Sequence, residues 1–171
     1  MKTKIKKSKL CGLIFPILCK GIIAGYKHDN EIKAELNKLP NDFSISLGIF
    51  PYGSYVRLVR INGRFFTTKQ YSPSDLEIIF KSIASAKATM LAKQNVAESF
   101  SKHQILLSGD ISKALILVRV INKIECYLFP RFMTKKILPP IQKQCSTLRM
   151  YSFVLFKNTK IPKQIMEVKN E

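Results

Sequence analysis

The dipeptide Asn62-Gly63 constrains the fold of this chain more than any other short feature of its sequence. Asn-Gly suits the two-residue turn of a β-hairpin, because both residues adopt the positive φ angles that such a turn requires. Residues 55–61 precede the turn and residues 64–70 follow it, and both runs have the pattern of β-strands. The sequence therefore predicts an antiparallel hairpin over residues 55–70.

A further strand is predicted on the N-terminal side of this hairpin. Four large apolar residues alternate there with small residues, which is the pattern of a strand with one buried face. A turn over residues 51–54 separates it from the hairpin, so we expect the three strands to form an antiparallel meander. The large residues are Phe43, Ile45, Leu47 and Ile49, and the small ones are Ser44, Ser46 and Gly48.

Helix-like and strand-like segments follow the meander. Residues 111–129 carry the broadest apolar stripe at helical spacing, and Asp110 is well suited to cap that helix. Residues 76–80 fit a strand slightly better than a helix. Because strands and helices are partly segregated along the chain, we predict an α+β fold. Shorter helices are expected at residues 31–39, 82–90, 95–102 and 131–138, and a short strand at 105–107, whereas residues 150–156 are apolar without a clear period.

The N-terminal segment allows three interpretations. Five lysines within residues 1–9 precede an apolar stretch over residues 10–18, which is too short to span a bilayer. The arrangement fits a signal peptide with a poor cleavage site, a helix lying on a membrane surface, or an ordinary core helix. We favour the surface helix and a cytoplasmic protein associated peripherally with the inner membrane surface. The expected membrane-contacting residues are Lys4, Lys6, Lys7, Lys9, Ile14, Phe15 and Leu18.

The charge of the chain points to anionic partners. The formal net charge is +18, which attracts anionic lipid headgroups or nucleic-acid phosphates. Aromatic and arginine residues on or near the predicted sheet suggest a surface that stacks RNA bases. Because the motif of RNA-recognition modules is absent, we expect these aromatic residues in the core and no nucleic acid as a partner, with RNA binding kept as an alternative. The residues concerned are Tyr52, Tyr55, Phe65 and Phe66, with Arg57, Arg60 and Arg64.

No pattern in the sequence predicts catalysis. The four cysteines form no CxxC pair and the two histidines stand apart from them, so we expect neither a metal site nor a cofactor. Phosphate-binding loops and the common hydrolase motifs are also missing. Glu125 lies among apolar neighbours on the long helix, where we expect it at the solvent edge rather than as a buried acid. The sequence therefore favours a protein that is not an enzyme.

An ordered set of segments resembles the sterol carrier protein type two, or nonspecific lipid-transfer, family. A strand ending in Gly109-Asp110 runs at once into a long apolar helix, and a segment from Glu125 to Phe132 contains Pro-Arg-Phe. Bacterial members of the family have a similar order of features. Residues 75–81 resemble the family's strand after the hairpin, which favours a strand at 76–80. The hairpin turn at residues 62–64 and the helix at residues 95–101 also fit.

The resemblance covers roughly residues 40–138 and implies a lipid carrier. It implies a curved, mainly antiparallel five-stranded sheet with helices on one face, enclosing an apolar tunnel for acyl, sterol-like or isoprenoid ligands. Residues 1–39 would be a basic N-terminal segment and residues 139–171 a basic C-terminal extension. An accessory role in ubiquinone biosynthesis, presenting a lipophilic intermediate to lipid-pathway enzymes, is the alternative within this family.

The resemblance also implies which residues line the tunnel. They lie on apolar faces of the elements that the family uses as tunnel walls, and we expect them to enclose a cavity of about 300 Å³ or more. An ordinary solid core is the alternative. The expected lipid-binding residues are Ile78, Phe80, Ile83, Met90, Phe100, Leu107, Leu115, Val118, Ile121, Phe129 and Phe132.

Overall fold

A single sheet of five strands has the order β3-β2-β1-β4-β5. β1 and β4 pair in parallel, and the other three neighbouring pairs are antiparallel. The computed structural model describes residues 2–50, 53–91, 93–135, 138 and 140–162, with side chains from residue 12 onward. The strands are β1 (Ser44–Ile49), β2 (Tyr55–Ile61), β3 (Arg64–Thr68), β4 (Leu76–Phe80) and β5 (Ile105–Gly109).

The sheet confirms the predicted meander. β1, β2 and β3 are consecutive and antiparallel, and the turn residues Asn62 and Gly63 have φ angles of 49° and 73°. Residues 76–80 form a strand, as the resemblance implied, and this strand lies beside β1 because the chain crosses over after β3. The fold class is therefore α+β, as predicted.

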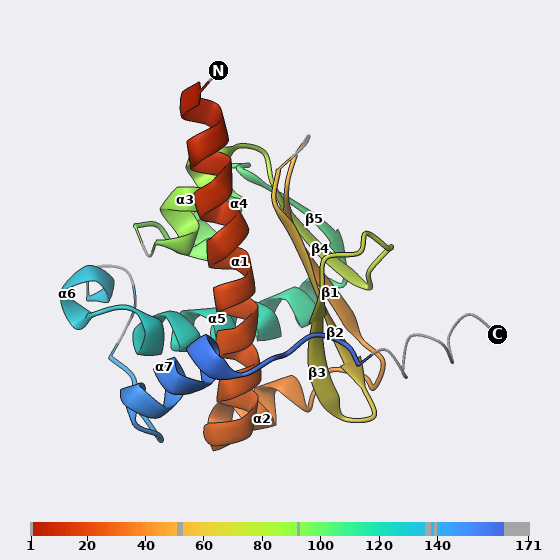
Figure 1. Cartoon of the computed structure of the whole chain (residues 1–171), viewed down its shortest axis with the longest axis vertical. Coiled ribbons are helices and arrows are strands. Elements are labelled where there is room, and N and C mark those ends of the chain that lie inside the picture. Colours follow the sequence, from red (N-terminus) through yellow and green to blue (C-terminus); the bar gives the residue numbers. More distant parts are fainter. Residues whose placement is uncertain (1, 51–52, 92, 136–137, 139, 163–171) are drawn as a thin grey trace.

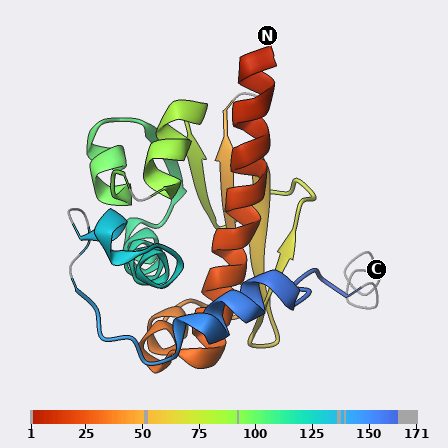
Figure 2. The ribbon, with the colours of Figure 1, turned by 60° about the vertical axis from the view of Figure 1, so that its left-hand side comes forward.

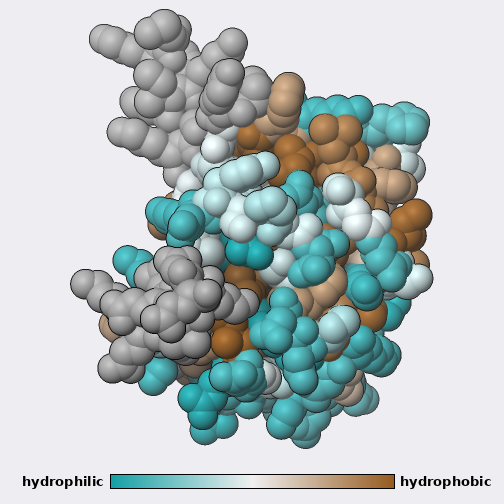
Figure 3. Space-filling model, turned by 90° about the vertical axis from the view of Figure 1, so that its right-hand side faces the viewer, coloured by the Kyte–Doolittle hydropathy of each residue, from teal (hydrophilic) through white to brown (hydrophobic). Residues whose placement is uncertain are grey.

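The helices gather on one side of this sheet (Figures 1 and 2). The other side carries a polar network over β1, in which Asp75 accepts hydrogen bonds from the backbone N–H of Ser44 at 2.8 Å and from its hydroxyl at 2.7 Å. Figure 3 shows this side, where hydrophilic residues dominate the lower half. The helices are α1 (Lys2–His28), α2 (Asn30–Leu36), α3 (Ile83–Met90), α4 (Val96–Ser101), α5 (Ile111–Leu128), α6 (Arg131–Thr134) and α7 (Thr147–Phe156).

The N-terminal segment forms α1, which packs into the core. Phe15 is fully buried and its ring stacks on Phe80 of β4, with centroids 6.1 Å apart. Leu18 and Ile22 are also buried. Gly21 allows α1 to cross α5 closely, because an added Cβ would lie 2.7 Å from the side chain of Ile124. Within the described residues, no helix is both long and apolar enough to cross a membrane.

The burial of α1 corrects part of the expected membrane-contacting set. Phe15 and Leu18 lie in the core, where they contact protein and not lipid, and Ile14 is half-buried. The physical reason is that the apolar inner face of the sheet must be covered by another element, and the apolar stretch of α1 provides part of that cover. The side chains of Lys4, Lys6, Lys7 and Lys9 lie outside the part of the structure that is described.

The C-terminal part of the chain joins the same core. α7 inserts Met150 and Val154, both buried, and lies beside α1 (Figure 1). Further on, the backbone N–H of Thr67 in β3 donates to the Thr159 carbonyl at 2.7 Å. Residues on both sides of positions 39 and 138 therefore share one hydrophobic core. The three sequence regions are not three separate structural units.

Candidate functional site

An apolar groove opens between β5, α4 and the first half of α5. Its volume is about 140 Å³. The described residues that line it are all apolar, and they come from β4, β5, α4 and α5. The lining residues are Ile78, Val96, Ala97, Phe100, Ile105, Leu107, Ile111, Ala114, Leu115 and Val118.

A tight turn from β5 into α5 fixes one end of the groove. Gly109 has a φ angle of +115°, and an added Cβ would lie only 2.3 Å from the Asp75 carbonyl oxygen. Asp110 then caps α5, since its side chain accepts a hydrogen bond from the Ser112 N–H at 2.7 Å. The predicted helix cap is therefore confirmed. Together the glycine and the cap hold the first turn of α5 beside β5.

The opposite wall of the groove is the short helix α4. Asn95 caps it by accepting a hydrogen bond from the Glu98 N–H at 2.6 Å. Val96 and Ser99 are its buried residues, whereas Phe100 turns its ring to the groove. A helix of six residues is too short to be stable by itself, so α4 depends on these few contacts to keep its place.

Large apolar side chains at the mouth of the groove remain in contact with solvent. Phe100 is 49% exposed, Ile111 64% and Leu115 53%. Clustered exposure of this kind is costly in water, and it is typical of surfaces that bind an apolar partner. None of the described residues that line the groove is charged, so the chemistry that they offer is apolar contact alone.

Part of the sequence-predicted site comes together here. Ile78, Phe100, Leu107, Leu115 and Val118 line the groove as expected. The other predicted residues do not line it. Phe80, Met90 and Ile121 are buried in the core, Ile83 and Phe129 are half-buried elsewhere, and Phe132 is exposed on α6.

Sequence reasoning missed several groove residues. Ile111 lies four positions before Leu115, and Ala114 lies four positions before Val118, so the helical period could have found both. Val96 and Ala97 lie on α4 next to the predicted Phe100. Their apolar character was visible, but the side of so short a helix that faces the groove was not.

The described residues form an open groove and not the expected enclosed tunnel. The groove holds about 140 Å³, less than half of the expected volume, and its mouth is open to solvent. α1 contributes to the difference, because the fully buried ring of Phe15 stacks on Phe80, a residue that was expected to line the tunnel. The inner face of the sheet is thus a solid core at its centre and a groove at its β5 edge.

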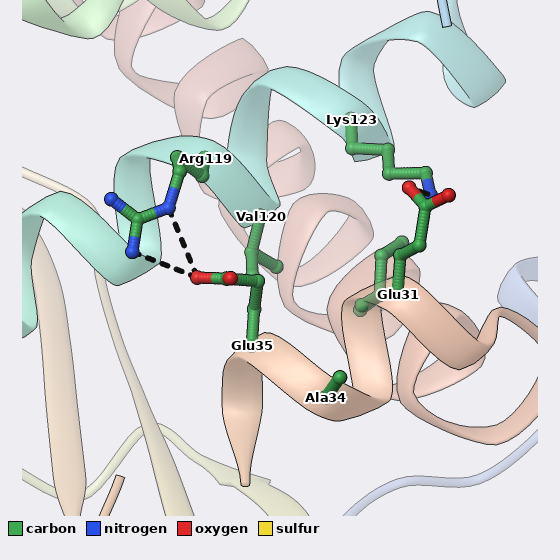
Figure 4. A pocket seen from close by; sticks show the side chains of 7 residues that line it. Glu31, Ala34, Glu35, Arg119, Val120 and Lys123 are labelled. Carbon is green, nitrogen blue, oxygen red and sulfur yellow. Dashed lines mark hydrogen bonds and ion pairs between the residues drawn. The ribbon is translucent and has the colours of Figure 1, made fainter. Parts of the chain in front are cut away.

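Two other hollows have different chemistry. The first, about 330 Å³, lies between α2 and α5 and is lined by charged side chains that are already paired. Arg119 donates to Glu35 at 2.8 and 3.0 Å, and Lys123 pairs with Glu31 (Figure 4). The second, about 390 Å³, lies among α1, β3 and residues 158–161 and has mixed lining. Neither combines an apolar lining with an open mouth.

Glu125 corrects another sequence expectation. It is 1% exposed, and within the described part of the chain neither carboxyl oxygen has a hydrogen-bond partner. Burial alone raises the pKa of this carboxyl from 4.5 to about 8. The acid was expected at the solvent edge, but the apolar stripe of α5 is broad enough to carry position 125 inside.

Comparisons with family models and with curated proteins find no match. Among solved structures, sterol carrier protein 2 from Yarrowia lipolytica is 14% identical, with a TM-score of 0.47 over 66% of this chain and 90% of that chain. A protein described as "UbiJ-SCP2 Ubiquinone synthesis protein" is 9% identical, with a TM-score of 0.46 over 61% and 90%. Sterol carrier protein 2 like 2 from Aedes aegypti is 16% identical, with a TM-score of 0.34 over 57% and 95%. These solved structures belong to the family that the sequence of this chain resembles, the sterol carrier protein type two domains.

Proposed function

We propose that this protein is a non-catalytic lipid-binding protein, which holds the apolar part of a lipid in the groove between β5, α4 and α5. The observation that carries the proposal is the groove itself, whose lining is wholly apolar and whose mouth exposes Phe100, Ile111 and Leu115. The resemblance of the sequence to lipid-transfer domains supports the same function.

The energetics of the groove suit an acyl or isoprenoid chain. Each methylene buried contributes about 0.8 kcal/mol, so a chain of moderate length binds without a charged partner. The present volume of about 140 Å³ accommodates only part of such a chain. Displacement of α4 would enlarge the groove, and the shortness of α4 makes this the wall that yields most easily.

We also propose that the protein collects its ligand at an anionic membrane, to which it associates peripherally. Support comes from α7, whose outer face exposes Leu148, Leu155 and Phe156 beside the exposed cations Arg149 and Lys157. Apolar residues insert into the headgroup region while cations near the surface contribute about 1 kcal/mol each. This surface replaces the buried residues of α1 as the apolar part of the membrane contact.

The same groove would serve two roles. One is the transfer of lipid between membranes, and the other is the presentation of a lipophilic intermediate to a lipid-pathway enzyme, such as one of ubiquinone biosynthesis. RNA binding is the competing class. The sheet offers less surface for stacking RNA bases than this alternative requires, because Phe65 and Arg60 are buried. Arg60 donates a hydrogen bond to the Leu39 carbonyl at 2.6 Å.

Extraction of the purified full chain tests the proposal. Organic extraction followed by mass spectrometry should release a lipid in stoichiometric amount from the native protein. The Leu115→Gln variant, which places an amide at the groove mouth, should release much less. Leu106→Gln is the matched control, because Leu106 is similarly exposed at 47% but does not line the groove. Co-purified RNA without lipid would contradict the proposal.

A further inference from the structure

A half-buried asparagine and a buried glutamate continue the face of α5 that lines the groove. The groove-lining residues of this helix end at Val118. Asn122 and Glu125 follow it at four and seven positions, which at 3.6 residues per turn places them along the same stripe. Glu125 lies about 10 Å beyond Val118 along the helix axis, at a rise of 1.5 Å per residue. The stripe is therefore apolar at its start and polar at its far end.

Neither polar group is satisfied within the described structure. Both carboxyl oxygens of Glu125 and the Oδ1 of Asn122 are buried without a hydrogen-bond partner. An unpaired buried polar atom costs roughly 1–3 kcal/mol, so proteins seldom keep several side by side without a use for them. Among the other buried polar groups that the structure describes, Arg60 also has one unpaired atom, its Nε, whereas Asp29 has four hydrogen bonds. Three of the four unpaired buried atoms in the described residues therefore lie where the groove's stripe continues.

Resting on the proposed function, we infer that Glu125 and Asn122 bind the polar end of the lipid, and that this end is a hydroxyl-type group able to donate a hydrogen bond. The lipid chain lies against Ala114 and Val118, and its terminal hydroxyl reaches the unpaired oxygens when the groove lengthens toward the C-terminal end of α5. Binding then satisfies groups that the ligand-free protein leaves unpaired.

The chemistry of the pair selects this class of ligand. Burial keeps Glu125 protonated at neutral pH, so its carboxyl group both donates and accepts one hydrogen bond, as an alcohol does. The Asn122 oxygen accepts a second bond. A negatively charged headgroup could accept a bond from protonated Glu125, but it would face the Asn122 oxygen and, among the described lining residues, no cation. A neutral lipid alcohol is the ligand that pairs with both residues.

The test compares two probes of equal length, 1-dodecanol and dodecane, by their displacement of a fluorescent fatty-acyl probe from the full chain. The wild-type protein should bind dodecanol about tenfold more tightly than dodecane, the expected gain from one hydrogen bond to a buried group. Glu125→Leu should reduce this ratio to near one. Glu125→Gln, which keeps hydrogen bonding, should preserve most of it.

Stability separates a ligand contact from a structural role. If the acid serves the ligand, Glu125→Leu should raise the melting temperature of the ligand-free protein while it abolishes the preference for the alcohol. Equal preference in the wild-type protein and the Leu variant would overturn the inference and leave the groove proposal intact. Failure of both probes to bind the wild-type protein would overturn the proposed function as well. If Glu125→Leu does not fold, Glu125→Met provides a second apolar replacement. It should lose the preference for dodecanol in the same way, and a Met variant that keeps the wild-type preference would overturn the inference.

Discussion

The hydroxyl of Tyr127 donates a 2.7 Å hydrogen bond to Asp29 Oδ2, and this bond joins α5 to the junction of α1 and α2. Both residues are buried. The other oxygen of Asp29 accepts hydrogen bonds from the N–H groups of Glu31 and Ile32 and from Lys123. The Tyr127 hydroxyl also accepts a bond from the Gln144 N–H at 2.8 Å. One tyrosine therefore connects the N-terminal helices, the groove helix and the segment that leads to α7.

Tyr127→Phe should lower the free energy of unfolding by about 1–3 kcal/mol, because it leaves a buried carboxylate oxygen and a backbone N–H without their partner. Urea denaturation measures this loss. Tyr71→Phe is the control, since Tyr71 is exposed and its replacement should change stability little. Equal midpoints for Tyr127→Phe and the wild-type protein would show that the connection contributes nothing.

Asp29 should make the folded state less stable at low pH. Desolvation opposes its ionisation, but hydrogen bonds from Tyr127, Ile32 and Lys123 outweigh it and lower the pKa below 3.8. Because the pKa of Asp29 is lower in the folded state, the stability that its carboxylate contributes is complete above pH 3.8, the pKa in the unfolded chain. This contribution is lost as the pH falls through the lower pKa of the folded state. Asp29→Asn should remove this part of the acid dependence in thermal melts between pH 2 and pH 5. An unchanged acid profile in the variant would contradict the assignment.

Glu125 should act in the opposite direction. Its pKa is raised from 4.5 to about 8 by burial, so the folded state keeps a proton that the unfolded chain releases. The contribution of Glu125 to stability is therefore fully present below pH 4.5 and is lost as the pH rises toward 8. Glu125→Gln should flatten the melting temperature across this window. A Gln variant that declines as steeply as the wild-type protein would show that the carboxyl group is already ionised in the folded state.

The turn between β5 and α5 should tolerate no side chain at Gly109. Gly109→Ala combines a positive φ angle, which costs roughly 1–3 kcal/mol, with a Cβ placed 2.3 Å from the Asp75 carbonyl oxygen. Gly63→Ala is the matched control, because Gly63 also has a positive φ angle but nothing lies within 4 Å of its added Cβ. Chemical denaturation should show a much larger loss for position 109. Equal losses would mean that the backbone angle alone matters.

The outer face of α7 should mediate membrane association. Replacement of Leu148 and Leu155 by Ser should reduce flotation of the full chain with anionic phosphatidylserine vesicles, and high salt should weaken the remaining binding. Ser replacement of the exposed Leu13 on α1 provides the control. If the α7 variant floats as well as the wild-type protein, another surface makes the contact.

Local signals explain what the sequence could predict. The Asn62-Gly63 turn, the alternation in β1 and the cap at Asp110 depend on residues that are close in the chain, so their patterns survive without tertiary information. The burial of α1 depends on distant partners such as Ile124 and Phe80. Nothing within residues 10–18 distinguishes a helix covered by a sheet from one covered by lipid, since both bury the same apolar side chains.

The candidate site was predictable only in part, for a similar reason. Periodicity places Leu115 and Val118 on the apolar stripe of α5, but the groove's extent depends on where α4 and β5 stop covering that stripe. Glu125 illustrates the limit: its helix position was known, and its burial follows only from the elements packed around α5.

Titration of the full chain with a fluorescent fatty-acyl probe tests the central claim most directly. We expect saturable binding by the wild-type protein and by Leu106→Gln, and at least tenfold weaker binding by Leu115→Gln, with all three proteins equally stable. A wild-type protein that fails to bind the probe, or a Leu115→Gln variant that binds it as tightly as the control, would contradict a lipid site between β5, α4 and α5.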